Sequence, residues 1–108
     1  MGNAHITNLY PTPNKTSADA PDEALAVDDT AGGVQFATLH EHTKYVMIDV
    51  QIANVRVTFD GSAPTATNGH ILVASQGLLV LSASAARKAK FIEDTATDAV
   101  VHMSQFID

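Results

Sequence analysis

The sequence predicts an all-β protein: a small β-sandwich or jelly-roll-like barrel with an extended N-terminal arm. From residue 34 onward, short runs alternate apolar and polar residues with period two, which is the pattern of half-buried strands. Turn residues separate these runs at intervals of about 8 to 12 residues, as in sandwiches and small barrels. The 108 residues suit one domain, and because there is no cysteine, packing or assembly must stabilise it.

Residues 1–33 differ in composition from the rest and are predicted to form the arm, with the β-sandwich domain at residues 34–108. The arm holds three of the four prolines, and its formal charge is -4 (five acids against one base), compared with -2 (seven acids against five bases) for the domain. Such a segment cannot order itself in isolation. It is either a disordered tail or an arm that docks on neighbouring chains. Its candidate capsid or subunit contacts are Ile6, Leu9, Tyr10, Leu25 and Val27.

Three strands are predicted in the first half of the domain. The run at residues 34–39 alternates only weakly, whereas the run at residues 44–52 has a clear core face. The run at residues 54–60 is the cleanest half-buried strand in the chain. The core face of the second run is Val46, Ile48, Val50 and Ile52. In the third run, Val55, Val57 and Phe59 alternate with Arg56, Thr58 and Asp60.

Two apolar runs follow, at residues 70–74 and 77–82. The short separation between them is typical of a hairpin whose turn places Gly77 at a positive φ. Because both runs are almost entirely apolar, we expect them to form the most buried pair of strands.

The last third of the chain begins with an Ala-rich stretch that fits two interpretations. It forms one or two helical turns capped by Ser82 or Ser84, or a strand broken by a short turn. We favour a short turn followed by a strand over residues 90–93. Residues 98–106 alternate clearly and are predicted to form the closing strand.

The residues do not favour enzyme chemistry. His40 and His42 are the best candidates for a metal pair, because side chains at i and i+2 of a strand point to the same side. A cupin site would place a Glu four or five residues later, where this chain has Val46 and Met47. The serines lie at turn positions, and no G-x-S-x-G sequence occurs. We predict no catalytic residue, no metal and no cofactor; a degenerate cupin-like metalloenzyme is the third-ranked alternative.

Charge and hydropathy narrow the range of partners. The net charge of -6, with only six Lys and Arg, argues against nucleic acid, whose binding depends on basic groups. No apolar run approaches the roughly 20 residues that span a bilayer, so we expect no membrane partner. The one basic cluster either contacts an acidic partner surface or is a solvated turn. It consists of Arg87, Lys88 and Lys90.

Three stretches within about residues 44–106 carry a resemblance to a known group of proteins. VRVTFDGSAPTATNGHIL, GLLVLS and AKFIEDTATDAVVHMSQF together resemble a pattern in small virion structural proteins of tailed bacteriophages. Within that group, the chain looks most like the capsid decoration, or cement, proteins. The arm lies outside the resemblance.

The resemblance implies a function in binding. It implies a small sandwich or jelly roll, commonly a homotrimer, that sits on the capsid surface, contacts the major capsid protein and bridges capsomers, after synthesis in the cytoplasm of the bacterial host. The surface or interface loop would contain Asp60, Ser62, Pro64, Thr65 and Thr67. The alternative is a head-fibre, tail or baseplate β-module that binds host carbohydrate or another virion protein.

Overall fold

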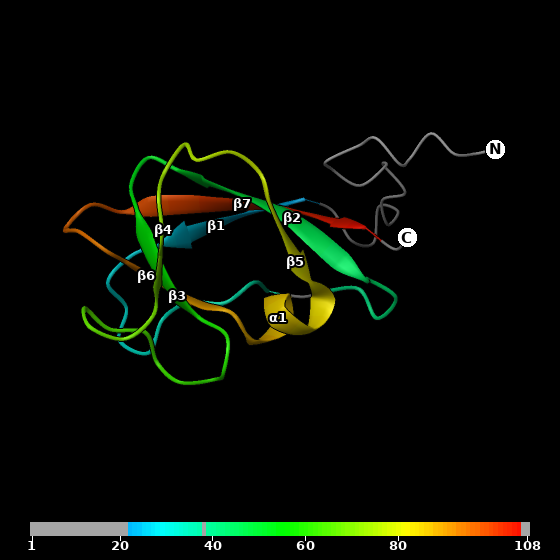
Figure 1. Ribbon diagram of the computed structural model, residues 1–108, viewed down its shortest axis with the longest axis horizontal. Coiled ribbons are helices and arrows are strands. Elements are labelled where there is room, and N and C mark those ends of the chain that lie inside the picture. The colour runs from blue at the N-terminus through cyan, green and yellow to red at the C-terminus, as the bar shows by residue number, and fades with distance from the viewer. Residues whose placement is uncertain (1–21, 38, 107–108) are drawn as a thin grey trace.

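The computed structural model, which describes residues 22–37 and 39–106, contains seven strands in two antiparallel sheets and one short helix (Figure 1). The four-stranded sheet has the order β1-β7-β2-β5, and the three-stranded sheet has the order β4-β3-β6. The predicted all-β class is confirmed. The strands are β1 (Glu23–Val27), β2 (Tyr45–Gln51), β3 (Val55–Thr58), β4 (His70–Leu72), β5 (Leu79–Ser82), β6 (Lys90–Glu93) and β7 (Ala99–Phe106).

Four antiparallel pairs are nested one inside another along the chain. β1 pairs with β7, Val34 forms a bridge to Phe91 in β6, β2 pairs with β5, and β3 pairs with β4. Two further pairings, β2 with β7 and β3 with β6, join these pairs sideways into the two sheets. The chain therefore passes repeatedly from one sheet to the other.

A single hydrophobic core contains residues from both sheets. Each strand contributes alternate residues, because successive side chains on a strand point to opposite faces. Five residues predicted to face the core are buried: Val46, Ile48, Val50, Val55 and Val57. Burying each such side chain contributes about 1.5 to 3 kcal/mol. The core is completed mainly by Val27, Phe91, Val101 and Met103.

The arm prediction is wrong for its C-terminal part, because residues 23–27 form β1 inside the four-stranded sheet. Val27 is fully buried, and Leu25 packs against the core. The strand was missed because acidic residues flank it on both sides and its apolar face has only two large side chains. The first 21 residues lie outside the part of the chain that the structure describes.

The prediction of a strand at residues 34–39 is also wrong. Among the described residues of this run, only Val34 pairs, through two backbone hydrogen bonds of 2.8 Å with Phe91. The ring of Phe36 is buried edge-on against that of Phe91, with centroids 5.4 Å apart. Beyond it, the Ala37 N–H donates to a carboxylate of β1 and not to a neighbouring strand. The weak alternation of this run reflects a segment anchored by one bridge and one aromatic side chain.

The predicted core residue Ile52 is exposed, so that prediction is wrong. Its side chain is 72 % exposed, and its φ is 78°. The Ala53 N–H donates to the Gln51 carbonyl at 2.9 Å, which makes a three-residue turn around Ile52. A β-branched residue at positive φ is strained. The period-two pattern ended at this turn, where the chain leaves the four-stranded sheet for β3.

The predicted hairpin of residues 70–74 and 77–82 does not form. β4 pairs with β3 and β5 pairs with β2, so the two runs belong to different sheets. Gly77 does have a positive φ, of 110°, but the turn redirects the chain between sheets. Both strands lie at sheet edges and keep half-exposed side chains, so they are not the most buried pair.

The Ala-rich stretch is helical, so the interpretation that we favoured for it is wrong. The helix α1 (Ala83–Lys88) begins after Ser82, whose hydroxyl accepts a hydrogen bond from the Ala85 N–H at 3.1 Å. Its buried residues are alanines, whose small side chains let it lie close to β2 and β5. The strand predicted to follow it is confirmed as β6. No helix in the described residues is long and apolar enough to cross a membrane.

Candidate functional site

The loop at residues 60–68 leaves β3 and is held in shape by its own polar side chains. The Asp60 carboxylate accepts from the Ser62 hydroxyl at 2.6 Å and from the Ser62 N–H at 3.0 Å. The Thr65 hydroxyl accepts from the backbone N–H groups of Thr67 and Asn68 at 3.2 and 3.0 Å. The Asn68 amide closes the loop by donating to the Ala63 carbonyl at 3.0 Å. These short-range bonds explain why the sequence places Asp, Ser, Thr and Asn here.

Three contacts fasten this loop to the sheets. The Thr58 hydroxyl donates to the Ser62 carbonyl at 2.6 Å, and the Lys90 ammonium donates to the Gly61 carbonyl at 2.9 Å. Pro64 is buried and touches the backbone at Gly33, where a side chain would meet the proline ring at 2.9 Å. The predicted interface loop is therefore a preformed surface feature, with its proline turned inward as an anchor.

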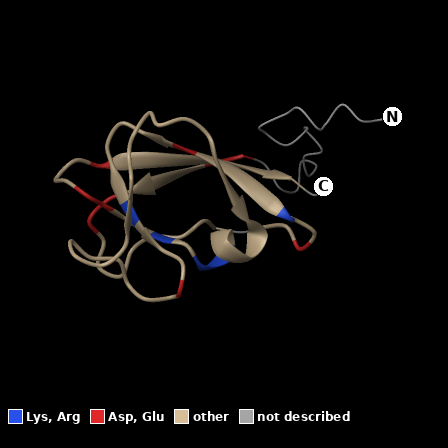
Figure 2. Cartoon of the chain, in the orientation of Figure 1, with Lys and Arg blue, Asp and Glu red and all other residues tan. Residues whose placement is uncertain are grey.

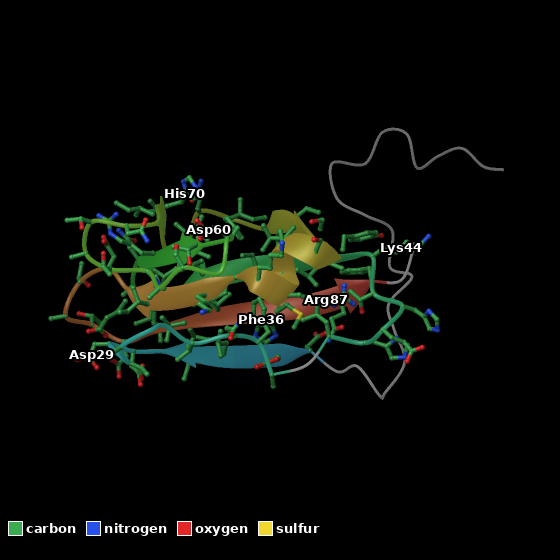
Figure 3. All side chains as sticks on the ribbon, turned by 90° about the horizontal axis from the view of Figure 1, so that it is seen from below. Asp29, Phe36, Lys44, Asp60, His70 and Arg87 are labelled. Carbon is green, nitrogen blue, oxygen red and sulfur yellow. The ribbon has the colours of Figure 1, made fainter. Side chains whose placement is uncertain are left out.

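A shallow, open depression of about 360 Å³ lies where this loop returns to β4. The rings of Phe59 and His70 flank each other with centroids 6.1 Å apart. Figure 3 shows Asp60 and His70 on the same side of the molecule. The depression combines an aromatic ring, a carboxylate, an amide and an imidazole. Its lining residues are Val57, Thr58, Phe59, Asp60, Asn68, Gly69 and His70.

The charge of Asp60 is stabilised by the loop itself. Hydrogen bonds from the Ser62 hydroxyl, and then from the Ser62 N–H, lower the pKa of Asp60 below its ordinary value of 3.8. The depression therefore presents a carboxylate, an acceptor of hydrogen bonds, throughout the neutral range.

The predicted contacts of the arm divide into two groups. Ile6, Leu9 and Tyr10 lie outside the described residues. Val27 is fully buried in the core of its own chain, and Leu25 is half-buried beside it. These two side chains therefore hold β1 to its own domain.

The predicted basic cluster is divided among separate contacts. The Arg87 guanidinium donates to the His40 carbonyl at 3.1 Å, and the Gln35 amide donates to the Arg87 carbonyl at 3.4 Å. Lys90 is bound to the loop at residues 60–68, as described above, whereas Lys88 is exposed. Two of the three side chains thus join segments of the same chain.

The two histidines lie in a turn, which removes the geometric reason for pairing them around a metal. The His42 N–H donates to Nδ1 of His40 at 3.1 Å, so this nitrogen is already an acceptor within the turn. The backbone N–H of His40 is bound to the Gln105 side chain at 2.9 Å. Among the described residues, no group of three or more His, Cys, Asp or Glu side chains is arranged to hold a metal ion.

Sequence reasoning did not predict an acidic patch formed by Asp28, Asp29, Glu93 and Asp98. The Glu93 N–H donates to the Asp28 carbonyl at 3.0 Å, which brings the end of β1 beside the end of β6. Figure 2 shows acidic positions gathered at this end of the molecule. Burial of the Glu93 carboxyl raises its pKa, and the neighbouring carboxyl of Asp98 raises it further. The pairing of strands that are distant in sequence brings these acids together, so no local sequence pattern predicts the patch.

Asp94, which follows Glu93 in the turn between β6 and β7, has its charge balanced by a base of the same chain. It forms an ion pair with Arg56, whose Nε lies 3.0 Å from the carboxylate. The same guanidinium donates to the Gly69 carbonyl at 3.2 Å, which fixes the start of β4. Arg56 therefore connects the β6–β7 turn to the far end of the loop at residues 60–68.

Comparisons of the chain with protein-family models, with curated proteins and with solved structures found no match.

Proposed function

We propose that this chain is a structural protein of a tailed-phage virion, a decoration protein that binds the outside of the capsid and bridges capsomers. The proposal starts from the resemblance of residues 44–106 to such proteins. It places the chain on the virion surface, in contact with the major capsid protein, after synthesis in the bacterial cytoplasm.

The nested pairing supports a jelly roll as the finer description of the fold. A jelly roll winds eight antiparallel strands into two sheets through two Greek keys. Here the pairs of β1 with β7, β2 with β5 and β3 with β4 are nested, as in a single long hairpin that has been wound up. An eight-stranded jelly roll has four such pairs, and the bridge between Val34 and Phe91 takes the place of the fourth. We therefore propose a jelly roll in which one strand is reduced to a single bridge.

The preformed loop at residues 60–68 is the observation that carries the binding proposal. A binding surface gains affinity when its ordering has been completed before the partner arrives. This loop is ordered by its own hydrogen bonds, by Pro64 and by Lys90, while Thr65 and Thr67 remain exposed. It can therefore present small polar groups to a partner at little further cost in entropy.

The test is co-sedimentation of the purified chain with capsids of the phage that encodes it, prepared without the chain. We expect binding by the natural chain and a loss of at least about tenfold for Thr67→Arg, because a long charged side chain at a well-packed interface removes more than about 1.4 kcal/mol. Ser84→Arg is the matched control, since it places the same side chain on the exposed side of α1. Failure of the natural chain to sediment with capsids would contradict the proposal.

The depression beside the loop favours a second candidate, a fibre, tail or baseplate module that binds host carbohydrate. Sugars are held by carboxylate and amide groups next to an aromatic ring, and Asp60, Asn68 and Phe59 provide these groups. Screening against glycans of the host surface tests it. Binding that is lost in Asp60→Ala, together with no binding to capsids, would favour this second function.

A further inference from the structure

β5 is an edge strand with an exposed apolar side. It pairs with β2 on one side and is the last strand of the four-stranded sheet, with no described strand on its other side. Val80 is 48 % exposed, and Leu78, just before the strand, is 43 % exposed. An uncovered apolar edge of this kind is a template for pairing with another strand.

The hydrogen-bond pattern shows which backbone groups of β5 are directed outward. The Ala83 N–H donates to the Lys44 carbonyl at 2.9 Å, in register with the pairing of Tyr45 and Ser82. In an antiparallel ladder, residues that bond the partner strand alternate with residues that point away from it. It follows that the N–H and carbonyl groups of Val80 point away from β2, toward the free edge.

The sequence around β5 lacks the charged side chains and the proline that commonly protect an edge strand. Edge strands are commonly protected by charged side chains, especially Lys, or by Pro. No Asp, Glu, Lys or Arg occurs from residue 61 to residue 86. The one proline in that range, Pro64, precedes β5 by 15 residues and is buried. The chain as a whole carries a net charge of -6, so two copies repel each other on average. The β5 edge is a place where two copies can meet without bringing like charges together.

We propose that β5 pairs with β5 of a second copy, antiparallel and around a two-fold axis at Val80. The Val80 N–H of each copy donates to the Val80 carbonyl of the other, and Leu78 of each lies opposite Ser82 of the other. The two four-stranded sheets then become one continuous eight-stranded sheet. The exposed side chains of the two Val80 residues pack against each other on its outer face.

We expect a dimer, because both partners use the same surface for this contact. Once two copies have paired, neither has that surface left to bind a third copy. The resemblance to decoration proteins implies three copies, which would need a contact between two different surfaces. The inference concerns the free protein, so it does not depend on binding to a capsid.

The contact is short, so the dimer is expected to dissociate on dilution. A standard interface buries about 800 Å² on each partner, and pairing through four or five residues buries less. Light scattering behind a sizing column should therefore give a mass that rises from 11.4 kDa toward twice that value as the concentration increases from about 10 to 500 μM.

Val80→Glu tests the contact, because it places two carboxylates face to face on the axis. We expect its dissociation constant to rise at least tenfold. Ile71→Glu is the matched control: Ile71 is also 48 % exposed and also lies on an edge strand, but in the other sheet. Both variants change the net charge equally, so general repulsion affects both, and only a contact at β5 separates them. Thermal melting verifies that each variant is folded.

Amide hydrogen exchange of the natural chain gives a readout that needs no variant. The Val80 amide should become more protected as the concentration rises, while the Ile71 amide should not. Equal masses for Val80→Glu and Ile71→Glu, or exchange at Val80 that is independent of concentration, would overturn the inference. A trimer unaffected by Val80→Glu would overturn it as well, and would support the subunit number that the resemblance implies.

Discussion

The four-stranded sheet ends in two edges that are built in opposite ways. The β1 edge is surrounded by acids, with Glu23 in the strand and Asp28 and Asp29 just after it, and its Val27 side chain is fully buried. The β5 edge has no charged residue, and it exposes Val80. One edge is therefore protected by charge, whereas the other carries no charge and exposes an apolar side chain.

The largest effect is expected from truncation at the β1 edge. Removing residues 1–21 leaves every described strand in place, whereas removing residues 1–30 also deletes β1 and the buried Val27. The longer truncation loses the pairing along β7 and exposes its core face, and should cost more than about 5 kcal/mol, most of the stability of a small domain. Urea denaturation of the two proteins measures this difference. Equal stability of the two would show that β1 contributes little.

A point substitution at each edge compares the two directly. Val27→Ala leaves a cavity in the core and should lower the free energy of unfolding by about 2 to 3 kcal/mol. Val80→Ala, at the half-exposed position on β5, should change it by less than about 0.5 kcal/mol, measured at a concentration where the chain is monomeric. Equal effects of the two substitutions would contradict the difference in burial between the two edges.

The connection that leaves the β1 edge contains two adjacent glycines that should respond differently to alanine. Both have a positive φ, 91° at Gly32 and 82° at Gly33. A methyl group at Gly33 would meet the Pro64 ring at 2.9 Å and the Phe91 carbonyl at 3.1 Å, whereas at Gly32 nothing lies within 4 Å. Gly33→Ala should therefore cost about 2 to 4 kcal/mol and Gly32→Ala only about 1 kcal/mol, the cost of the strained φ alone. Thermal unfolding of both variants measures the difference, and equal costs would show that the Pro64 contact can yield.

The smallest effect is expected from the acidic patch next to β1, and it depends on pH. The pKa of Glu93 is raised above its ordinary value of 4.5, so the folded chain holds this proton more tightly than the unfolded chain does. Stability should therefore increase as the pH falls from neutral through the raised pKa of Glu93. Glu93→Gln should raise the melting temperature at pH 7 and remove this increase.

Asp60, in the loop beside the depression, serves as the contrasting control for the pH experiment. Its pKa is lowered, so its contribution is present above about pH 3.8 and is lost as the pH falls further. Melting curves of Asp60→Asn should therefore differ from those of the natural chain mainly at neutral pH, with the variant less stable. A Glu93→Gln variant that is less stable than the natural chain at pH 7 would contradict the assigned role of the patch.

The regular strands could be predicted because their period-two patterns are local. β2, β3 and β7 each place apolar residues on every second position, and a strand that is buried on one face requires that pattern. The buried faces of β2 and β3 followed directly, as Val46 and Val55 illustrate. β6 was found because it follows the ambiguous Ala-rich stretch as a short apolar run.

The errors occurred where distant pairing decided the outcome. The apolar runs around β4 and β5 looked like a hairpin, but β3 and β2 compete for them and separate them into two sheets. β1 is a strand because β7 pairs with it, although its own composition favours an arm. The loop at residues 60–68 was predicted from its turn residues, whereas its attachment through Gly33 and the assembly of the acidic patch depend on contacts between segments far apart in sequence.

The nesting of the strand pairs sets the order in which the fold can be assembled. Val57 with His70 closes a short loop, whereas Glu23 with Met103 closes nearly the whole described chain. Loop-closure entropy grows with the length of the loop, so the inner pairs can form first and β1 docks last. Folding dominated by such distant contacts takes milliseconds to seconds. During that interval the uncharged β5 segment is available to other unfolded chains, so the yield of native protein should depend on its concentration during synthesis.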